Sequence, residues 1–123
     1  MGRPLFVYGT LRSGEPQAAL LGDLTRRRAW TRGTLWALPA GYPALVPGDE
    51  GRVEGELVDA PDERVLTLLD AYEGVDEGLF ERVPVGVFVG LRSFEAWAYT
   101  LDAARAKAGR RIPSGRWFAI RRR

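Results

Sequence analysis

The chain has 123 residues, of which 46% are hydrophobic and 28% are charged, and its formal net charge at pH 7 is +2. This length and composition favour a single folded domain over residues 1–123 and exclude an intrinsically disordered chain. We find no apolar run near the roughly 18 residues of a membrane span and no secretory signal at the N-terminus, so we expect a cytoplasmic protein without membrane contact.

The absence of histidine and cysteine limits the chemistry more than any other feature. It excludes thiolate nucleophiles, histidine-based triads and zinc sites with His or Cys ligands. Acid–base chemistry near neutral pH is then left to a carboxylate, a tyrosine or the single lysine, Lys107. No carboxylate cluster suggests a metal site, and no cofactor is expected.

The chain also has no asparagine and one glutamine, Gln17, which fits a thermophilic source, although a GC-rich genome explains the arginine bias equally well.

The first half of the chain is predicted to be mostly strands. A short apolar run at residues 4–8 indicates a buried first strand, and residues 10–16 form a loop. One or two helical turns are expected at residues 17–24. Residues 29–38 alternate loosely and predict a strand with a bulge at Gly33.

A Pro/Gly-rich connection follows, with a short strand at residues 44–46 and another strand at residues 52–58. Residues 60–74 contain the clearest helix. Pro61 suits its first helical position, and Gly74 suits its end. The helical spacing predicts that one face is buried, formed by Val65, Leu68, Leu69 and Tyr72.

The last part of the chain predicts a hairpin of two strands, residues 79–89 and 94–101, joined through residues 90–93. The tail from residue 103 holds a short helical piece, a turn at residues 112–115 and a final segment at residues 117–120. Many strands with one solid helix indicate a compact, sheet-dominated α+β fold that could be barrel-like.

The loop after the first strand, YGTLRSGEP, has the glycine spacing of a phosphate-binding P-loop at Gly9 and Gly14. A P-loop needs Lys and then Ser or Thr after the second glycine, where this chain has Glu15 and Pro16. We therefore exclude a nucleotide site. Two readings stay open from the residues alone: an ordinary turn, or a backbone nest for a carboxylate or oxyanion.

A second candidate site is the end of the predicted helix, where Asp70 and Glu73 lie close to its C-terminus. Exposed carboxylates tolerate that position, so they could be ordinary surface groups. A partly buried Glu73 would instead have a raised pKa, as a general base working near neutral pH requires.

Three arginine clusters, at residues 26–28, 110–111 and 121–123, could in principle contact nucleic acid phosphates. No aromatic-rich RNA-binding motif or DNA-reading helix accompanies them, and acidic residues nearly balance them. We therefore expect no nucleic-acid partner.

Seven pieces of the sequence, in this order and spacing, resemble the gamma-glutamylcyclotransferase-like (AIG2-like) family. They are FVYGTLRSGEP, GYPALV, VEGELV, LLDAYEG, FERVPV, AWAY and IPSGRW. The Gly-Thr-Leu form of the first motif is similar to the form of this motif in gamma-glutamylamine cyclotransferases and their bacterial relatives. Four positions depart from the family pattern: Phe80 in place of Tyr, Gln17-Ala18 in place of Asn-His, and Arg116 in place of Asp.

The resemblance implies a small mixed β-barrel-like sheet with a few short helices packed outside. It also implies an enzyme that cleaves a gamma-glutamyl amide and releases 5-oxoproline. Glu73 would be the acid–base residue, and the substrate would be held by Tyr8, Gly9, Thr10 and Leu11, with Arg82 and Tyr99 as further cavity residues. The alternative is a non-catalytic module that binds a gamma-glutamyl or carboxylate ligand.

Overall fold

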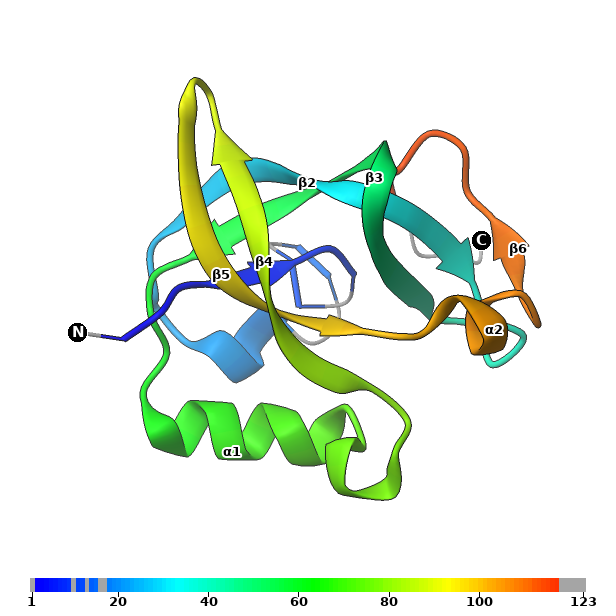
Figure 1. Ribbon diagram of the computed structural model, residues 1–123. Helices are drawn as coiled ribbons and strands as arrows, with labels where there is room; N and C mark the ends of the chain where they lie inside the picture. The colour runs from blue at the N-terminus through cyan, green and yellow to red at the C-terminus, as the bar shows by residue number, and fades with distance from the viewer. Residues whose placement is uncertain (1, 10, 13, 16–17, 118–123) are drawn as a thin grey trace.

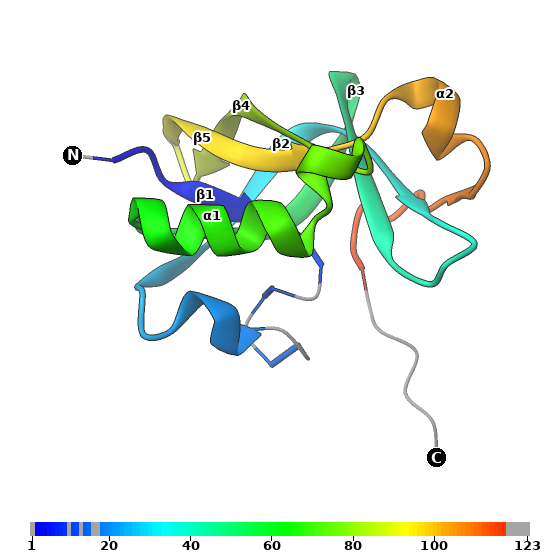
Figure 2. The same ribbon diagram turned by 90° about the horizontal axis from the view of Figure 1, so that it is seen from below.

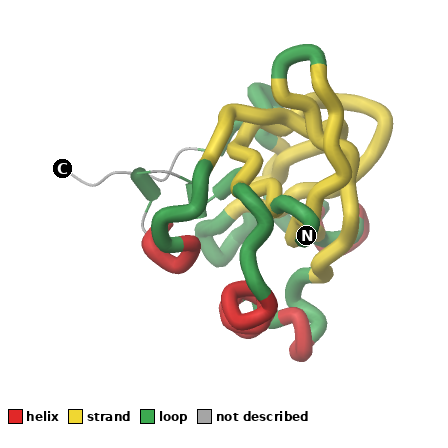
Figure 3. The backbone as a smooth tube through the Cα atoms, turned by 90° about the vertical axis from the view of Figure 1, so that its left-hand side faces the viewer, coloured by secondary structure: helices red, strands yellow, loops and turns green. Residues whose placement is uncertain are grey.

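The computed structural model describes residues 2–9, 11–12, 14–15 and 18–117 of the chain. Its strands form a twisted sheet, and the helical segments lie outside the sheet (Figures 1 and 3). In chain order the elements are β1 (Leu5–Val7), the 3-10 helix η1 (Ala18–Leu21), β2 (Arg26–Ala37), β3 (Pro43–Val58), α1 (Glu63–Tyr72), the 3-10 helix η2 (Val75–Glu77), β4 (Glu81–Val89), β5 (Arg92–Thr100), α2 (Ala103–Ala106) and β6 (Arg110–Arg111).

The sheet closes on itself to form a barrel. Antiparallel pairs join β1 to β3, β3 to β2, β2 to β4 and β4 to β5. The barrel closes where β5 meets β1 in the parallel sense, with Leu5 opposite Trp97. Strand β6 extends β2 at one edge. The expected mixed, barrel-like α+β fold with short helices outside is therefore confirmed.

Strand β1 is buried on both faces, which explains its uninterrupted apolar sequence. Phe6 and Tyr8 belong to the hydrophobic core inside the barrel, whereas Leu5 and Val7 belong to a second core that includes Leu69 of α1. Figure 2 shows α1 running beside β1 on the outside of the barrel. The loop after β1 therefore starts from a strand that both cores hold in place.

Strands β2 and β3 form the longest ladder of the barrel. The predicted bulge at Gly33 is confirmed, because the pairing register shifts between Arg32, which faces Arg52, and Gly33, which faces Pro47. The prediction of two separate strands at residues 44–46 and 52–58 is wrong, since both belong to β3. Residues 48–51 bulge out between the two paired segments, so the strand continues despite its Pro/Gly-rich sequence.

Helix α1 begins later than predicted. Asp62 is its N-cap and accepts a 2.9 Å hydrogen bond from the backbone N–H of Val65, so Pro61 precedes the helix instead of occupying its first position. The predicted stop is confirmed, because Gly74 follows the C-cap residue Glu73 with a left-handed φ of 67°.

The buried face of α1 is only partly the predicted one, with Leu69 confirmed and Leu66 buried in place of Leu68. Leu66 and Leu69 are buried, but Leu68 is 53% exposed and Tyr72 is 46% exposed. Leucines occupy both faces of this helix, so their spacing alone could not choose between the faces, and the packing of Leu69 on the core beside β1 chooses one. Glu73 follows Leu66 and Leu69 at helical spacing and so lies on the buried side.

The predicted hairpin is confirmed as β4 and β5, joined by a tight turn at Gly90 and Leu91. A short helix, α2, follows as expected, and the backbone N–H of Ile112 then bonds the carbonyl of Leu35 on β2. The predicted final segment at residues 117–120 lies outside the described residues except for Trp117, which is buried.

In the described part of the chain, we find no helix of the length and apolarity that a bilayer crossing needs.

Candidate active site

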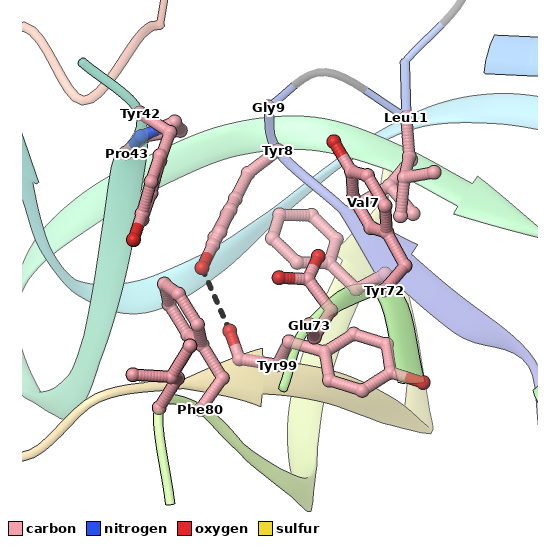
Figure 4. Close-up of a pocket in the computed structure, with 12 residues that line it drawn as sticks. Val7, Tyr8, Gly9, Leu11, Tyr42, Pro43, Tyr72, Glu73, Phe80 and Tyr99 are labelled. Carbon is pink, nitrogen blue, oxygen red and sulfur yellow. Dashed lines mark hydrogen bonds between the residues drawn. The ribbon is translucent and has the colours of Figure 1, made fainter. Parts of the chain in front are cut away.

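A cavity of about 230 Å³ lies between the loop after β1, the end of α1 and the start of β4 (Figure 4). Segments far apart in the sequence contribute its walls, which is typical of a ligand site. Its lining residues are mainly aromatic and aliphatic: Phe6, Val7, Tyr8, Gly9, Leu11, Tyr42, Pro43, Tyr72, Glu73, Leu79, Phe80 and Tyr99.

Glu73 is the acidic group of this cavity. It caps the C-terminal end of α1, where its backbone N–H bonds the carbonyl of Leu69 at 2.8 Å. Its half-buried carboxylate points into the cavity toward the hydroxyl of Tyr8 (Figure 4). None of the residues that the structure describes forms a hydrogen bond or ion pair with this carboxylate. An unneutralised carboxylate in an apolar cavity is available to take up a proton.

Burial raises the pKa of Glu73 to about 7. A carboxyl with this pKa is substantially ionised at neutral pH and still accepts a proton readily, as a general base and then a general acid must. The role of Glu73 as the acid–base residue stays a prediction.

Tyr8 lies on the opposite wall of the cavity, and its hydroxyl bridges two strands. It donates a 2.7 Å hydrogen bond to the carbonyl of Tyr99 on β5 and accepts one of 3.1 Å from the backbone N–H of Leu45 on β3. Burial, and then the negative charge of Glu73, raise the pKa of Tyr8, so its hydroxyl stays protonated. Tyr8 therefore shapes the wall and ties β1 to its neighbours.

Asp70 lies one turn before Glu73 on α1 but has the opposite electrostatic character. Its carboxylate accepts hydrogen bonds from Arg82 Nε at 2.8 Å, from Arg82 Nη2 at 3.1 Å and from the Tyr99 hydroxyl at 2.7 Å. Burial alone would raise the pKa of Asp70, but the bonds from Arg82 and Tyr99 outweigh it and lower that pKa. Asp70 is thus an ionised anchor for the end of α1.

The two further cavity residues expected from the sequence, Tyr99 and Arg82, lie in different positions relative to the cavity. Tyr99 lines the cavity, although its hydroxyl is directed to Asp70. Arg82 is not among the lining residues: it binds Asp70, and its guanidinium lies 4.5 Å from the centre of the Trp97 ring. A contact between Arg82 and a ligand stays a prediction.

The loop after β1 lies beside Glu73 and supplies backbone to the cavity. Gly9 and Leu11 line it, whereas Thr10 lies outside the described residues. In the described part of the chain, the N–H groups of Gly9 and Leu11 donate no hydrogen bond to a protein acceptor. Gly9 packs on Pro43, since a methyl group at Gly9 would lie 2.7 Å from Pro43 Cγ. Only glycine lets the backbone come this close.

Two arginines hold this loop from outside the cavity. Arg26 donates to the carbonyls of Leu11 at 2.6 Å and Ala18 at 2.9 Å, and pairs with Glu56 at 3.1 Å. Arg12 donates to the carbonyls of Gly9, at 3.2 Å, and Trp117. The first arginine cluster therefore includes a residue that stabilises the loop.

No group of three or more acidic side chains in the described residues could hold a metal ion.

Several cavity residues were not expected from the sequence. Tyr42 immediately precedes β3, Pro43 is the first residue of β3, and Leu79 lies just before β4, so the closed barrel brings them to Glu73. Tyr72 was expected in the core but lies at the cavity, 46% exposed. The signal for Tyr42 and Pro43 was the GYPALV motif, which contains both.

The fold and the cavity define a small β-barrel domain in which the described cavity lining includes one half-buried carboxyl, that of Glu73. A family model described as "Gamma-glutamyl cyclotransferase, AIG2-like" matches residues 5–119, and the chain belongs to this family, whose name is that of an enzyme.

Known relatives agree with this assignment. The chain is 33% identical over 111 residues to a gamma-glutamylaminecyclotransferase of Bos taurus, a match covering 79% of this chain and 64% of the relative. The chain thus spans less than two thirds of that relative's length. Among solved structures, it is similar to an AIG2-like protein of Mus musculus, with a TM-score of 0.75 and 25% identity over 98% of this chain and 97% of that one. It is also similar to YkqA of Bacillus subtilis, with a TM-score of 0.77 and 31% identity, covering 95% of this chain and 40% of that one.

Proposed function

We propose that this protein cleaves a small gamma-glutamyl amide by intramolecular cyclisation, releasing 5-oxoproline and a free amine. The observation that carries the proposal is the carboxyl of Glu73, which points into the cavity with a pKa of about 7. The family assignment and the bovine relative, a gamma-glutamylaminecyclotransferase, support the same reaction.

In the proposed reaction the substrate supplies its own nucleophile. Its α-amino nitrogen attacks the γ-carbonyl carbon, the new C–N bond closes a five-membered ring, and the C–N bond to the departing amine breaks. Such intramolecular attack can be worth an effective molarity of about 10⁵–10⁸ M when the reacting atoms are held in place. A chain without histidine or cysteine can therefore carry out this chemistry, because it needs no nucleophile of its own.

Glu73 would move the protons. An α-amino group has a pKa of roughly 8 and is mostly protonated at neutral pH, so a base must remove its proton before attack. Glu73 would take that proton and give it to the departing nitrogen as the C–N bond breaks, which returns the carboxylate to its starting state. The second proton that the attacking nitrogen loses on becoming the lactam N–H passes to the released amine, which leaves as an ammonium ion. A base with a much lower pKa would take up the proton less readily.

The loop after β1 would hold the substrate. The N–H groups of Gly9 and Leu11 suit a carboxylate or the oxyanion that forms on the γ-carbonyl, and we extend this role to Thr10 from the sequence motif. Losing one oxyanion donor typically costs about 10²–10³ in rate. Tyr8 and Tyr99 would form the walls, and Arg82 would act through Asp70, which anchors the end of α1.

The test is 5-oxoproline release from several gamma-glutamyl amides by the wild type and by Glu73→Gln. We expect turnover by the wild type and none by Glu73→Gln, with binding of the amides retained. The control is Glu77→Gln, which removes an exposed carboxylate a few residues further on and should keep full activity. Turnover by Glu73→Gln would contradict the role of Glu73. Binding without turnover by the wild type would instead support a non-catalytic binding module.

A further inference from the structure

The exposed large hydrophobic side chains of this protein are not scattered evenly. Among the described residues they are Tyr42, Leu68, Tyr72, Leu79 and Leu91. Three of them, Tyr42 at 38%, Tyr72 at 46% and Leu79 at 49%, also line the cavity. Single exposed hydrophobic residues are ordinary, but their convergence at one cavity from three separate segments indicates a surface that a ligand covers.

Two of these side chains are held in place by the fold. Leu79 packs against Gly74, where a methyl group would lie 2.6 Å from Leu79 Cδ1, and the N–H of Leu79 bonds the carbonyl of Gly74 at 3.0 Å. Tyr42 packs against Phe80, with ring centroids 6.0 Å apart. The apolar rim is therefore a preformed surface beside Glu73.

Among the described residues, no positively charged side chain lies at this rim. Glu73 is the one carboxylate among the described lining residues, and no lysine or arginine lines the cavity within that part of the chain. The nearest arginine in the sequence, Arg82, is paired with Asp70. Arg105, which donates to the carbonyl of Gly78 next to Leu79, is paired with Asp102 at 2.8 Å. A carboxylate on the departing amine would meet an apolar surface and the negative charge of Glu73.

We infer that the departing amine of the substrate is an uncharged apolar or aromatic one, seated on the subsite formed by Tyr42, Tyr72 and Leu79. This inference rests on the proposed function and specifies its substrate class. The γ-glutamyl group would fill the inner cavity beside Gly9 and Leu11. The amine portion would extend to the rim, where its burial removes apolar surface from water.

The test compares γ-glutamyl benzylamide with γ-glutamylglycine and with a γ-glutamyl amide of a diamine, whose departing groups are apolar, anionic and cationic. We expect kcat/KM for the benzylamide to exceed both others about tenfold or more, since an apolar subsite discriminates on this scale. Leu79→Ala and Tyr42→Ala should each reduce this preference. The matched control is Leu68→Ala, which removes a similarly exposed leucine outside the cavity and should leave the preference unchanged.

A charge substitution gives a second, directional test. Leu79→Arg should shift the preference toward γ-glutamylglycine, because it places a positive charge where the carboxylate of glycine would lie. Equal turnover of the three amides by the wild type, or a preference unaffected by Leu79→Arg, would overturn the inference.

Binding separates this inference from the proposed function. Calorimetry on Glu73→Gln measures affinity for the three intact amides without turnover. If the wild type releases no 5-oxoproline but Glu73→Gln binds the benzylamide about tenfold more tightly, the proposed function fails and the apolar subsite stands. If the wild type turns over the amides but Glu73→Gln binds them equally, the subsite is refuted and the function stands. Absence of binding to any of them also refutes the subsite.

Discussion

The Tyr99 hydroxyl on β5 donates a 2.7 Å hydrogen bond to Asp70 Oδ1 on α1, one helical turn before Glu73. Arg82 on β4 adds two hydrogen bonds to the same carboxylate. The last turn of α1 is thereby tied to two strands of the barrel. This attachment fixes where Glu73 leaves the helix and keeps its side chain directed into the cavity.

Asp70→Asn should destabilise the protein by about 1–3 kcal/mol, because it leaves a half-buried Arg82 without its counter-charge. Urea unfolding at neutral pH measures the loss. The matched control is Glu54→Gln, which removes another two-bond carboxylate–arginine pair, with Arg116, that is more exposed to solvent. We expect a clearly smaller loss for the control, because water screens exposed pairs. Equal losses of stability in the two variants would show that the Asp70–Arg82 pair contributes no more than an exposed ion pair.

The stability of the protein should depend on the ionisation of Glu73. Burial raises its pKa from 4.5 to about 7, so between these values the folded chain keeps a proton that the unfolded chain releases. The stabilisation that this proton provides is complete at pH values below the pKa of Glu73 in the unfolded chain. It is lost as the pH rises through the pKa of Glu73 in the folded chain. Glu73→Gln stays neutral, so its stability relative to the wild type should grow from about pH 4 to pH 8, by at most about 3 kcal/mol.

Urea unfolding of both proteins across this pH range measures the difference. A stability difference between Glu73→Gln and the wild type that does not change with pH would mean that the carboxyl of Glu73 is fully hydrated, and would remove the electrostatic basis of its proposed role.

Gly9→Ala should reduce kcat/KM about tenfold or more. The added methyl group would lie 2.7 Å from Pro43 Cγ, so the loop after β1 must move, and small misplacements of a substrate-holding group are costly to rate. Adding Pro43→Ala removes the clash and should restore part of the activity. Gly86→Ala is the control, because no atom lies within 4 Å of its added methyl group. No recovery in the double variant would show that the contact with Pro43 is not the cause.

Tyr8→Phe should lower the free energy of unfolding by about 1–3 kcal/mol, because it leaves the buried N–H of Leu45 and the carbonyl of Tyr99 without a partner. Chemical denaturation measures the loss. Tyr42→Phe removes a hydroxyl that bonds none of the described residues and should have little effect on stability. Unchanged stability of Tyr8→Phe with lost turnover would instead assign the Tyr8 hydroxyl to the substrate.

Local sequence patterns predicted the elements well where one residue type decides the outcome. The bulge at Gly33 and the helix stop at Gly74 follow from backbone conformations that glycine adopts easily. On the buried face of α1 the pattern was right for Leu69 but wrong for Leu68, which is exposed while Leu66 is buried. Helical spacing permits either face, and the choice depends on which strand the helix packs against.

The division of roles between Asp70 and Glu73 could not be predicted from their positions in the sequence. Both are carboxylates near the end of one helix, yet the pKa of Asp70 is lowered and that of Glu73 is raised. The difference comes from Arg82 and Tyr99, which reach Asp70 from β4 and β5 and leave Glu73 to the cavity.

The sequence by itself determined the available chemistry. Without histidine or cysteine, acid–base catalysis near neutral pH falls mainly to a carboxylate, and the YGTL and LDAYEG motifs point to the loop and the carboxylate that we propose take part. Only the tertiary structure decided that Glu73 is the carboxyl with a pKa near neutrality and that an apolar rim surrounds it. The physical reason is that residue identity sets which groups can ionise, whereas burial and partners from distant strands set the pKa at which they do so.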